Sequence, residues 1–135
     1  MKALHRMERF LDKHMIPFEV VVHPHTHTSI ETARAAGIPP GRVAKGVLLD
    51  GQDCQMVAMI PADEEIHLGK LGLDQGVEFS LADEASVSRL FSECGPGVVP
   101  GLPNAWGVEM EWEEDLMAQP DIDLEGGEHE GQLHN

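Results

Sequence analysis

The segment at residues 28–50 constrains the fold more than any other, because it joins a helix pattern to an apolar strand through a rigid turn. Thr28 and Glu31 have the spacing of a capping box, which predicts a helix over 29–36. A Gly-Ile-Pro-Pro-Gly turn follows, and the chain then enters a strand that carries a single cation, Lys45. Proteins usually tolerate such a lysine when its ammonium meets an anion. The pattern therefore predicts a helix-and-strand fold with Lys45 beside an anionic ligand.

Hydrophobic periodicity predicts that helices and strands interleave along the whole chain. The expected helices are 3–14, 29–36, 67–71, 83–91 and 113–117. The expected strands are 18–23, 44–50, 54–60, 77–80, 107–110 and 122–124, with a short last strand after Gly126-Gly127. Their irregular order, with a hairpin, predicts one domain over residues 1–135 of the α/β (α+β) class. We expect a mixed, partly closed β-barrel-like sheet flanked by helices.

The net charge of −15 is distributed unevenly. Residues 109–135 hold ten Asp and Glu and no Lys or Arg, so this portion alone carries −10. Such acidity argues against DNA and against broad nucleic-acid binding, which require a cationic face, but it leaves room for a local site for one nucleotide end. It also keeps a protein soluble.

Membrane and targeting signals are missing from the sequence. No apolar run approaches the roughly 20 residues that a membrane span needs, and the first residues have the pattern of an amphipathic helix rather than of a signal peptide. Cys54 and Cys94 have neither metal nor redox spacing. We therefore expect a cytoplasmic protein with two reduced cysteines, each a small buried apolar side chain.

Two features could bind a substrate through charge or backbone groups. Lys45 could anchor a phosphate or a developing oxyanion, although most strand lysines extend into water instead. The glycine- and proline-rich loop Gly95–Gly101 could present backbone N–H groups to an oxyanion, or it could be an ordinary rigid surface turn. Side-chain chemistry alone leaves both alternatives open.

Histidines form a third group of candidates. His23, His25 and His27 alternate, so on an extended chain they would share one face and could chelate a metal, or they could form a solvent-facing loop. His129 follows a glycine turn from which it could reach a pocket. Neither a Gly-x-Ser-x-Gly nor a His-Glu-x-x-His motif occurs, so any hydrolysis would depend on positioning and electrostatics.

Five short motifs occur in a fixed order over about residues 5–130. They are His23-Pro24 with Thr28, Val43-Ala44-Lys45, Ile60-Pro61-Ala62-Asp63, Pro96-Gly97-Val98-Val99-Pro100, and Gly127-Glu128-His129. Each motif alone is weak, but five in order are fairly specific. Together they resemble the YbaK / prolyl-tRNA-synthetase-associated editing domain family.

The resemblance implies a trans-acting deacylase that hydrolyses the ester of a mischarged tRNA, in particular a tRNA(Pro) carrying a small non-cognate amino acid. The partner would be the 3′ acceptor end of aminoacyl-tRNA, with an aminoacyl-tRNA synthetase as a further candidate. Lys45 would hold the phosphate side of the terminal adenosine, and Gly97 and Pro100 would position the ester. The substrate-binding residues it implies are His23, Thr28, Gly46, Pro96, Val98, Val99, Gly101, Gly127 and His129. The family requires no metal and no cofactor.

Three departures from the family pattern bear on this interpretation. Gly46 follows the lysine where many relatives have Thr, Ala or Ser, and the acidic end is heavy for a tRNA partner. The chain stops at Asn135 where relatives usually continue into a last helix, so we expect either a fold trimmed of that helix or an incomplete sequence. The alternatives are a non-catalytic module of the same fold that binds a nucleotide or a synthetase and, with less support, a metal-binding protein using the three alternating histidines.

Overall fold

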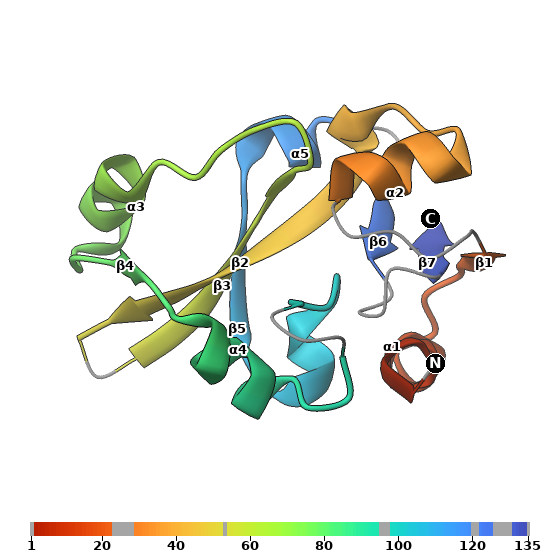
Figure 1. Cartoon of the computed structure of the whole chain (residues 1–135), viewed down its shortest axis with the longest axis horizontal. Helices are drawn as coiled ribbons and strands as arrows, with labels where there is room; N and C mark the ends of the chain where they lie inside the picture. Colours follow the sequence, from red (N-terminus) through yellow and green to blue (C-terminus); the bar gives the residue numbers. More distant parts are fainter. Residues whose placement is uncertain are drawn as a thin grey trace.

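The computed structural model describes residues 2–22, 29–52, 54–94, 98–119, 122–125 and 131–134. Its helices are α1 Lys2–Lys13, α2 Ser29–Ala36, α3 Leu68–Gln75, α4 Glu84–Leu90 and α5 Glu114–Met117, with 3-10 turns η1 Pro40–Arg42 and η2 Pro103–Trp106. Its strands are β1 Glu19–Val22, β2 Val43–Gly51, β3 Cys54–Pro61, β4 Ser80–Leu81, β5 Glu109–Trp112, β6 Asp123–Glu125 and β7 Gly131–His134. Figure 1 shows these elements arranged around the long β2–β3 hairpin.

The strands form one mixed sheet in the order β1-β7-β6-β2-β3-β5, and β4 pairs with the far end of β2. The hairpin is antiparallel, whereas β2 with β6 and β3 with β5 are parallel pairs. The predicted mixed sheet with flanking helices is confirmed. The expected partial closure is wrong: in the described part of the chain the two end strands, β1 and β5, do not pair with each other, so the sheet is open.

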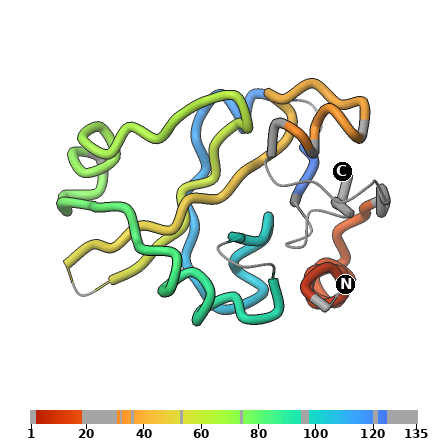
Figure 2. The backbone as a smooth tube through the Cα atoms, viewed as in Figure 1, coloured from red at the N-terminus to blue at the C-terminus, as the bar shows by residue number. Residues whose placement is uncertain are grey.

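The two faces of the hairpin carry different parts of the core, because successive side chains of a strand point to opposite faces. On one face Leu48, Val57 and Met59 belong to a cluster that includes α1 and Phe91. On the other face Leu49, Met56, Ala58 and Phe79 form a second cluster, joined by residues of α3. Helix α2 covers the beginning of β2, where Ala33 packs with Val43 and Ala62. Figure 2 shows the chain path that places these helices around the hairpin.

The region after α3 differs from its sequence prediction. The helix continues to Gln75 and ends at Gly76, which has a left-handed φ of 69°. The backbone N–H of Val77 then donates to the carbonyl of Gly72, 3.1 Å away, so Val77 caps the helix instead of beginning a strand. The strand expected at 77–80 is reduced to Ser80–Leu81.

The cysteine prediction fails at one of its two positions. Cys54 is exposed, because it begins β3 at the tip of the hairpin, beyond the packed core. Cys94 is partly buried and packs against the first core cluster. None of the helices in the described part of the chain is long and apolar enough to cross a membrane.

Candidate functional site

Lys45 lies on β2 opposite Ile60, so the two side chains leave the same face of the hairpin. Its ammonium nitrogen, Nζ, donates to the carbonyl oxygen of Ala62 at 3.3 Å in a partly buried environment. A neutral carbonyl orients the ammonium without cancelling its charge. Lys45 therefore retains the electrostatic attraction for an anion that its position in the sequence predicts.

The edge of β2 next to Lys45 is interrupted. On the side away from β3, β2 pairs with β6 at Val43 and Ala44, and with β4 at Leu49 and Asp50. No strand of the described residues pairs with the stretch in between on that side. The N–H of Ala82 donates to the carbonyl of Leu48 at 3.0 Å, so the interruption comprises residues 45–47. The backbone groups on this side of residues 45–47, which we call the edge segment, therefore have no strand partner among the described residues.

The described part of the glycine- and proline-rich loop lies against this edge segment. A Cβ atom placed on Gly46 would lie 2.6 Å from Cγ1 of Val99 and 2.9 Å from Cγ1 of Val57, so the loop approaches the strand too closely for any side chain there. Pro100 and Gly101 are buried. The surface-turn alternative is therefore wrong for this part of the loop, which forms part of the core.

Lys45 and the loop thus converge on Gly46, but from opposite faces of β2. The Cβ direction of Gly46 points to Val99, and alternation sends the Lys45 side chain to the other face, where it reaches Ala62. The structure therefore brings together Lys45, Gly46 and Val99 at one point of the strand, and Pro100 follows directly in the chain. The ammonium itself is not directed at the loop.

The remaining predicted site residues lie outside the described residues. They are His23, Thr28, Pro96, Gly97, Gly127 and His129, and the alternating histidines His25 and His27 belong with them. The role of Val98 and Gly101 in substrate binding also remains a prediction, although both are described.

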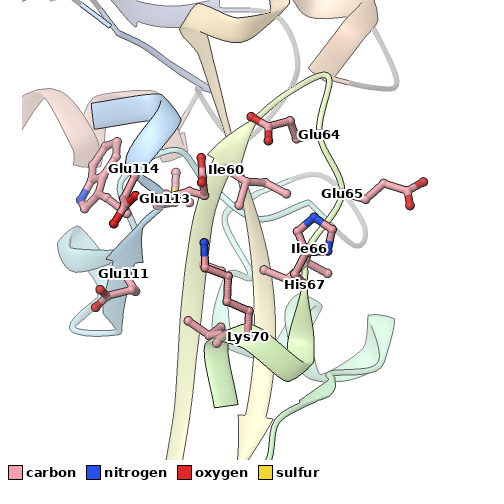
Figure 3. A pocket seen from close by; sticks show the side chains of 13 residues that line it. Ile60, Glu64, Glu65, Ile66, His67, Lys70, Glu111, Glu113 and Glu114 are labelled. Atoms are coloured by element: carbon pink, nitrogen blue, oxygen red, sulfur yellow. The ribbon is translucent and has the colours of Figure 1, made fainter. Parts of the chain in front are cut away.

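Sequence analysis missed an acidic cavity of about 160 Å³ on the Lys45 face of the hairpin. Ile60 forms part of its floor, and its polar wall comes from α3, from β5 and α5, and from the segment between β3 and α3. In Figure 3 Lys70 rises from α3 between carboxylates of Glu111 and Glu113 on one side and Glu64 with His67 on the other. The sequence feature that could have predicted this acidic cavity is the high density of carboxylates at residues 109–115.

Three carboxylates cluster at the edge of this cavity. Oxygens of Glu64, Glu113 and Asp115 lie within 4.8 Å of one another. Desolvation, followed by the negative charges of Asp115, Glu113 and Asp63, raises the pKa of Glu64 above its ordinary value of 4.5. Phosphate groups are repelled by such a cluster, and the volume is below the roughly 300–1,000 Å³ of typical ligand pockets. The cavity is therefore not a site for a tRNA end.

The chain belongs to the aminoacyl-tRNA editing domain family, whose model matches residues 23–135. That match confirms the resemblance drawn from the five motifs. It begins at the first of these motifs, His23-Pro24, and covers the hairpin, the loop and the acidic end. No curated protein matches the sequence.

Solved structures agree on the fold. A protein described as a proposed trans-editing enzyme for prolyl-tRNA synthetase is 22% identical with a TM-score of 0.85, covering 100% of this chain and 87% of that chain. The hypothetical protein APE2540 is 17% identical with a TM-score of 0.85, covering 96% of this chain and 87% of that chain. A chain from a study of epitope grafting onto scaffold proteins is 21% identical with a TM-score of 0.83, covering 100% and 86%. At these identities the likeness concerns the fold alone.

Proposed function

We propose that this protein is a trans-acting aminoacyl-tRNA deacylase that hydrolyses the ester of a mischarged tRNA, in particular a tRNA(Pro) carrying a small non-cognate amino acid. Membership of the editing-domain family supports the reaction class. The tRNA(Pro) substrate follows the resemblance to prolyl-tRNA-synthetase-associated domains. It agrees with the description of one structural relative as a proposed trans-editing enzyme for prolyl-tRNA synthetase.

The observation that carries the proposal is the contact between the loop and β2 at Gly46, one residue from Lys45. A loop held in the core at this point can keep its backbone N–H groups in fixed directions, which is what stabilisation of a tetrahedral oxyanion requires. Lys45 supplies the positive charge nearest the contact in sequence, for the phosphate side of the terminal adenosine. The loop would then stabilise the oxyanion on one face of β2, and Lys45 would bind the phosphate on the other face.

The chemistry needs little beyond this positioning. The scissile bond is an ester, and attack by a water molecule on its carbonyl carbon releases the free amino acid and the ribose hydroxyl of the tRNA. Holding the ester and the water together converts a bimolecular step into an intramolecular one. Removal of one oxyanion donor typically costs ~10²–10³ in rate. Editing is needed because one methylene changes binding in a synthetase pocket by only about 1–3 kcal/mol.

A deacylation assay tests the proposal. Alanyl-, cysteinyl- and seryl-tRNA(Pro) are compared with prolyl-tRNA(Pro), using wild type, Lys45→Ala and the control Lys70→Ala. Lys70 is an exposed lysine of α3, so its replacement makes the same chemical change away from the edge segment. We expect one mischarged species to be hydrolysed, with activity lost in Lys45→Ala and kept in Lys70→Ala. Equal rates for wild type and Lys45→Ala would overturn the mechanism.

Absence of turnover on every tRNA of the panel would argue against the deacylase and for the non-catalytic binding module. Saturable binding of an aminoacyl-adenosine analogue without hydrolysis would then identify that module. Lys45→Arg separates a need for charge from a need for lysine geometry, since arginine keeps the charge but presents a planar fork instead of a compact ammonium.

A further inference from the structure

Helix α1 has the largest net positive charge of the helices and strands in the described part of this acidic chain. It holds four of the nine Lys and Arg residues and two of the 24 Asp and Glu residues, so its net charge is +2 and that of the rest of the chain is −17. A helix that only needed solvation could carry charges of either sign. The excess of cations on this helix of an otherwise acidic chain points to a negatively charged partner.

Two of the four cationic side chains of α1, Arg9 and Lys13, lie in line with His5 on its solvent-facing side. His5, Arg9 and Lys13 are four residues apart, so they follow one another along one face of the helix, and all three are exposed. Successive members rise about 6 Å along the helix axis. The opposite face, with Leu4 and Met7, is buried in the core. We call His5, Arg9 and Lys13 the basic ridge.

The basic ridge is held in a fixed place. Arg6, on its flank, forms an ion pair with Glu93, and its guanidinium carbon lies 5.2 Å from the ring centre of Trp106. These contacts fasten α1 to η2 and to the segment after α4. Glu8 and Asp12 also lie on α1, so the ridge is a narrow band with acidic groups beside it. It suits a row of phosphates better than a broad polyanionic surface.

The acidic cavity makes it unfavourable for tRNA phosphates to approach the protein over α3 and α5. Glu64, Glu111, Glu113, Glu114 and Asp115 surround it, and in Figure 1 its elements α3 and α5 lie away from α1. Phosphates approaching over the cavity would meet several carboxylates, whereas Lys45, on the same face of the hairpin, is not among the residues that line the cavity. A tRNA bound to this protein therefore has an electrostatic reason to lie over α1.

We propose that the basic ridge of α1 binds backbone phosphates of the tRNA acceptor stem while the 3′ end reaches the edge segment of β2. The proposal rests on the proposed deacylase function and adds a docking surface outside the residues that the family model matches, which begin at residue 23. Arg9 and Lys13 would then increase the affinity for the tRNA, and hydrolysis of the ester would take place at the edge segment.

The test compares Arg9→Gln/Lys13→Gln with the control Lys70→Gln/Arg89→Gln, which makes the same change in net charge at exposed residues of α3 and α4. For the α1 variant we expect KM for mischarged tRNA to rise about tenfold, with kcat unchanged. The slope of log KM against log salt should fall by about 1.5, since each phosphate contact contributes about 0.7–0.9. Neither variant should change hydrolysis of a small aminoacyl-adenosine substrate.

Equal KM values and salt slopes in the two variants would overturn the ridge while leaving the deacylase function intact. If wild type hydrolyses no tRNA of the panel, the deacylase function fails, and the ridge is then tested by fluorescence anisotropy with labelled, uncharged tRNA. Weaker binding by the α1 variant alone would support the ridge under either result. Thermal unfolding of both variants checks that they are folded.

Discussion

Val99 occupies the space that a side chain at Gly46 would need. The distance from a Cβ at position 46 to Cγ1 of Val99 would be 2.6 Å, closer than carbon atoms normally approach. This contact joins the glycine- and proline-rich loop to β2 beside Lys45. It also accounts for the glycine at this position, because the Val99 side chain lies where a Cβ would be.

Gly46→Ala should therefore destabilise the protein by about 1–3 kcal/mol, the usual cost of overpacking a well-packed core. Chemical denaturation measures this change. Gly69→Ala is the matched control, because a Cβ there meets nothing within 4 Å and alanine favours a helix. The double variant Gly46→Ala/Val99→Ala should recover part of the loss. If Gly46→Ala is as stable as wild type, the close packing of the loop is wrong.

Asp83→Ala should destabilise α4 at neutral pH, because the Ser86 backbone N–H donates to Oδ1 of Asp83 at 2.7 Å. This hydrogen bond holds the pKa of Asp83 below its ordinary value of 3.8. A lowered folded-state pKa gives stability that is present above that ordinary value and is lost as pH falls through the lowered one. The difference in Tm between wild type and Asp83→Ala should thus be largest at neutral pH and shrink below about pH 4.

Asp83→Asn serves as the control for charge, since asparagine is also a good N-cap. It should keep more stability than Asp83→Ala at neutral pH, and its stabilising effect should not depend on pH in the acidic range. An identical pH profile for all three proteins would contradict the cap.

Glu64→Gln should stabilise the protein at neutral pH, because it removes a carboxylate that lies among Asp115, Glu113 and Asp63. The pKa of Glu64 is raised in the folded state, so folding takes up protons and this residue opposes stability increasingly as pH rises through that raised value. Tm measured at pH 3 and pH 7 should show the gain mainly at pH 7. The neighbouring exposed Glu65 is not among the groups that raise the pKa of Glu64, so it provides the control Glu65→Gln, with little effect expected.

The two cysteines should differ in their reaction with a thiol reagent such as 5,5′-dithiobis(2-nitrobenzoic acid). Cys54 is exposed at the hairpin tip, whereas Cys94 is partly buried against the core. We expect one fast and one slow thiol under native conditions, and two equal ones in denaturant. Cys54→Ser should remove the fast phase. Two thiols of equal rate in the native protein would show that the hairpin tip is covered.

Local sequence signals predicted the elements well where they act over short distances. The helix at 29–36 has the predicted bounds, and Gly37, the first residue of the predicted turn, has a left-handed φ of 71°. The hairpin also follows from its turn residues and apolar strands. Val77 was misassigned because the alternation of apolar and polar residues at 77–80 suits a strand, while the Val77 N–H completes a helix end.

Long-range relationships were harder to predict. The pairing of β2 with β6, the interruption at residues 45–47 and the contact of Val99 with Gly46 depend on residues far apart in the sequence. The acidic cavity likewise combines Glu64 with Glu113, and the sequence presents these only as separate charged segments. Motif order singled out Lys45 and the loop that contains Val99, but it did not predict that the two lie on opposite faces of β2.

The pairing of β1 with β7 sets the order in which this domain can assemble on the ribosome. Among the described strands β1 pairs with β7 alone, so the strand made first waits for the strand made last. The hairpin and α3 can pack earlier, since they need only neighbouring sequence. β6, which bounds the edge segment on one side, also comes from the last part of the chain. A nascent chain can therefore complete this sheet only after residues 123–134 have been made.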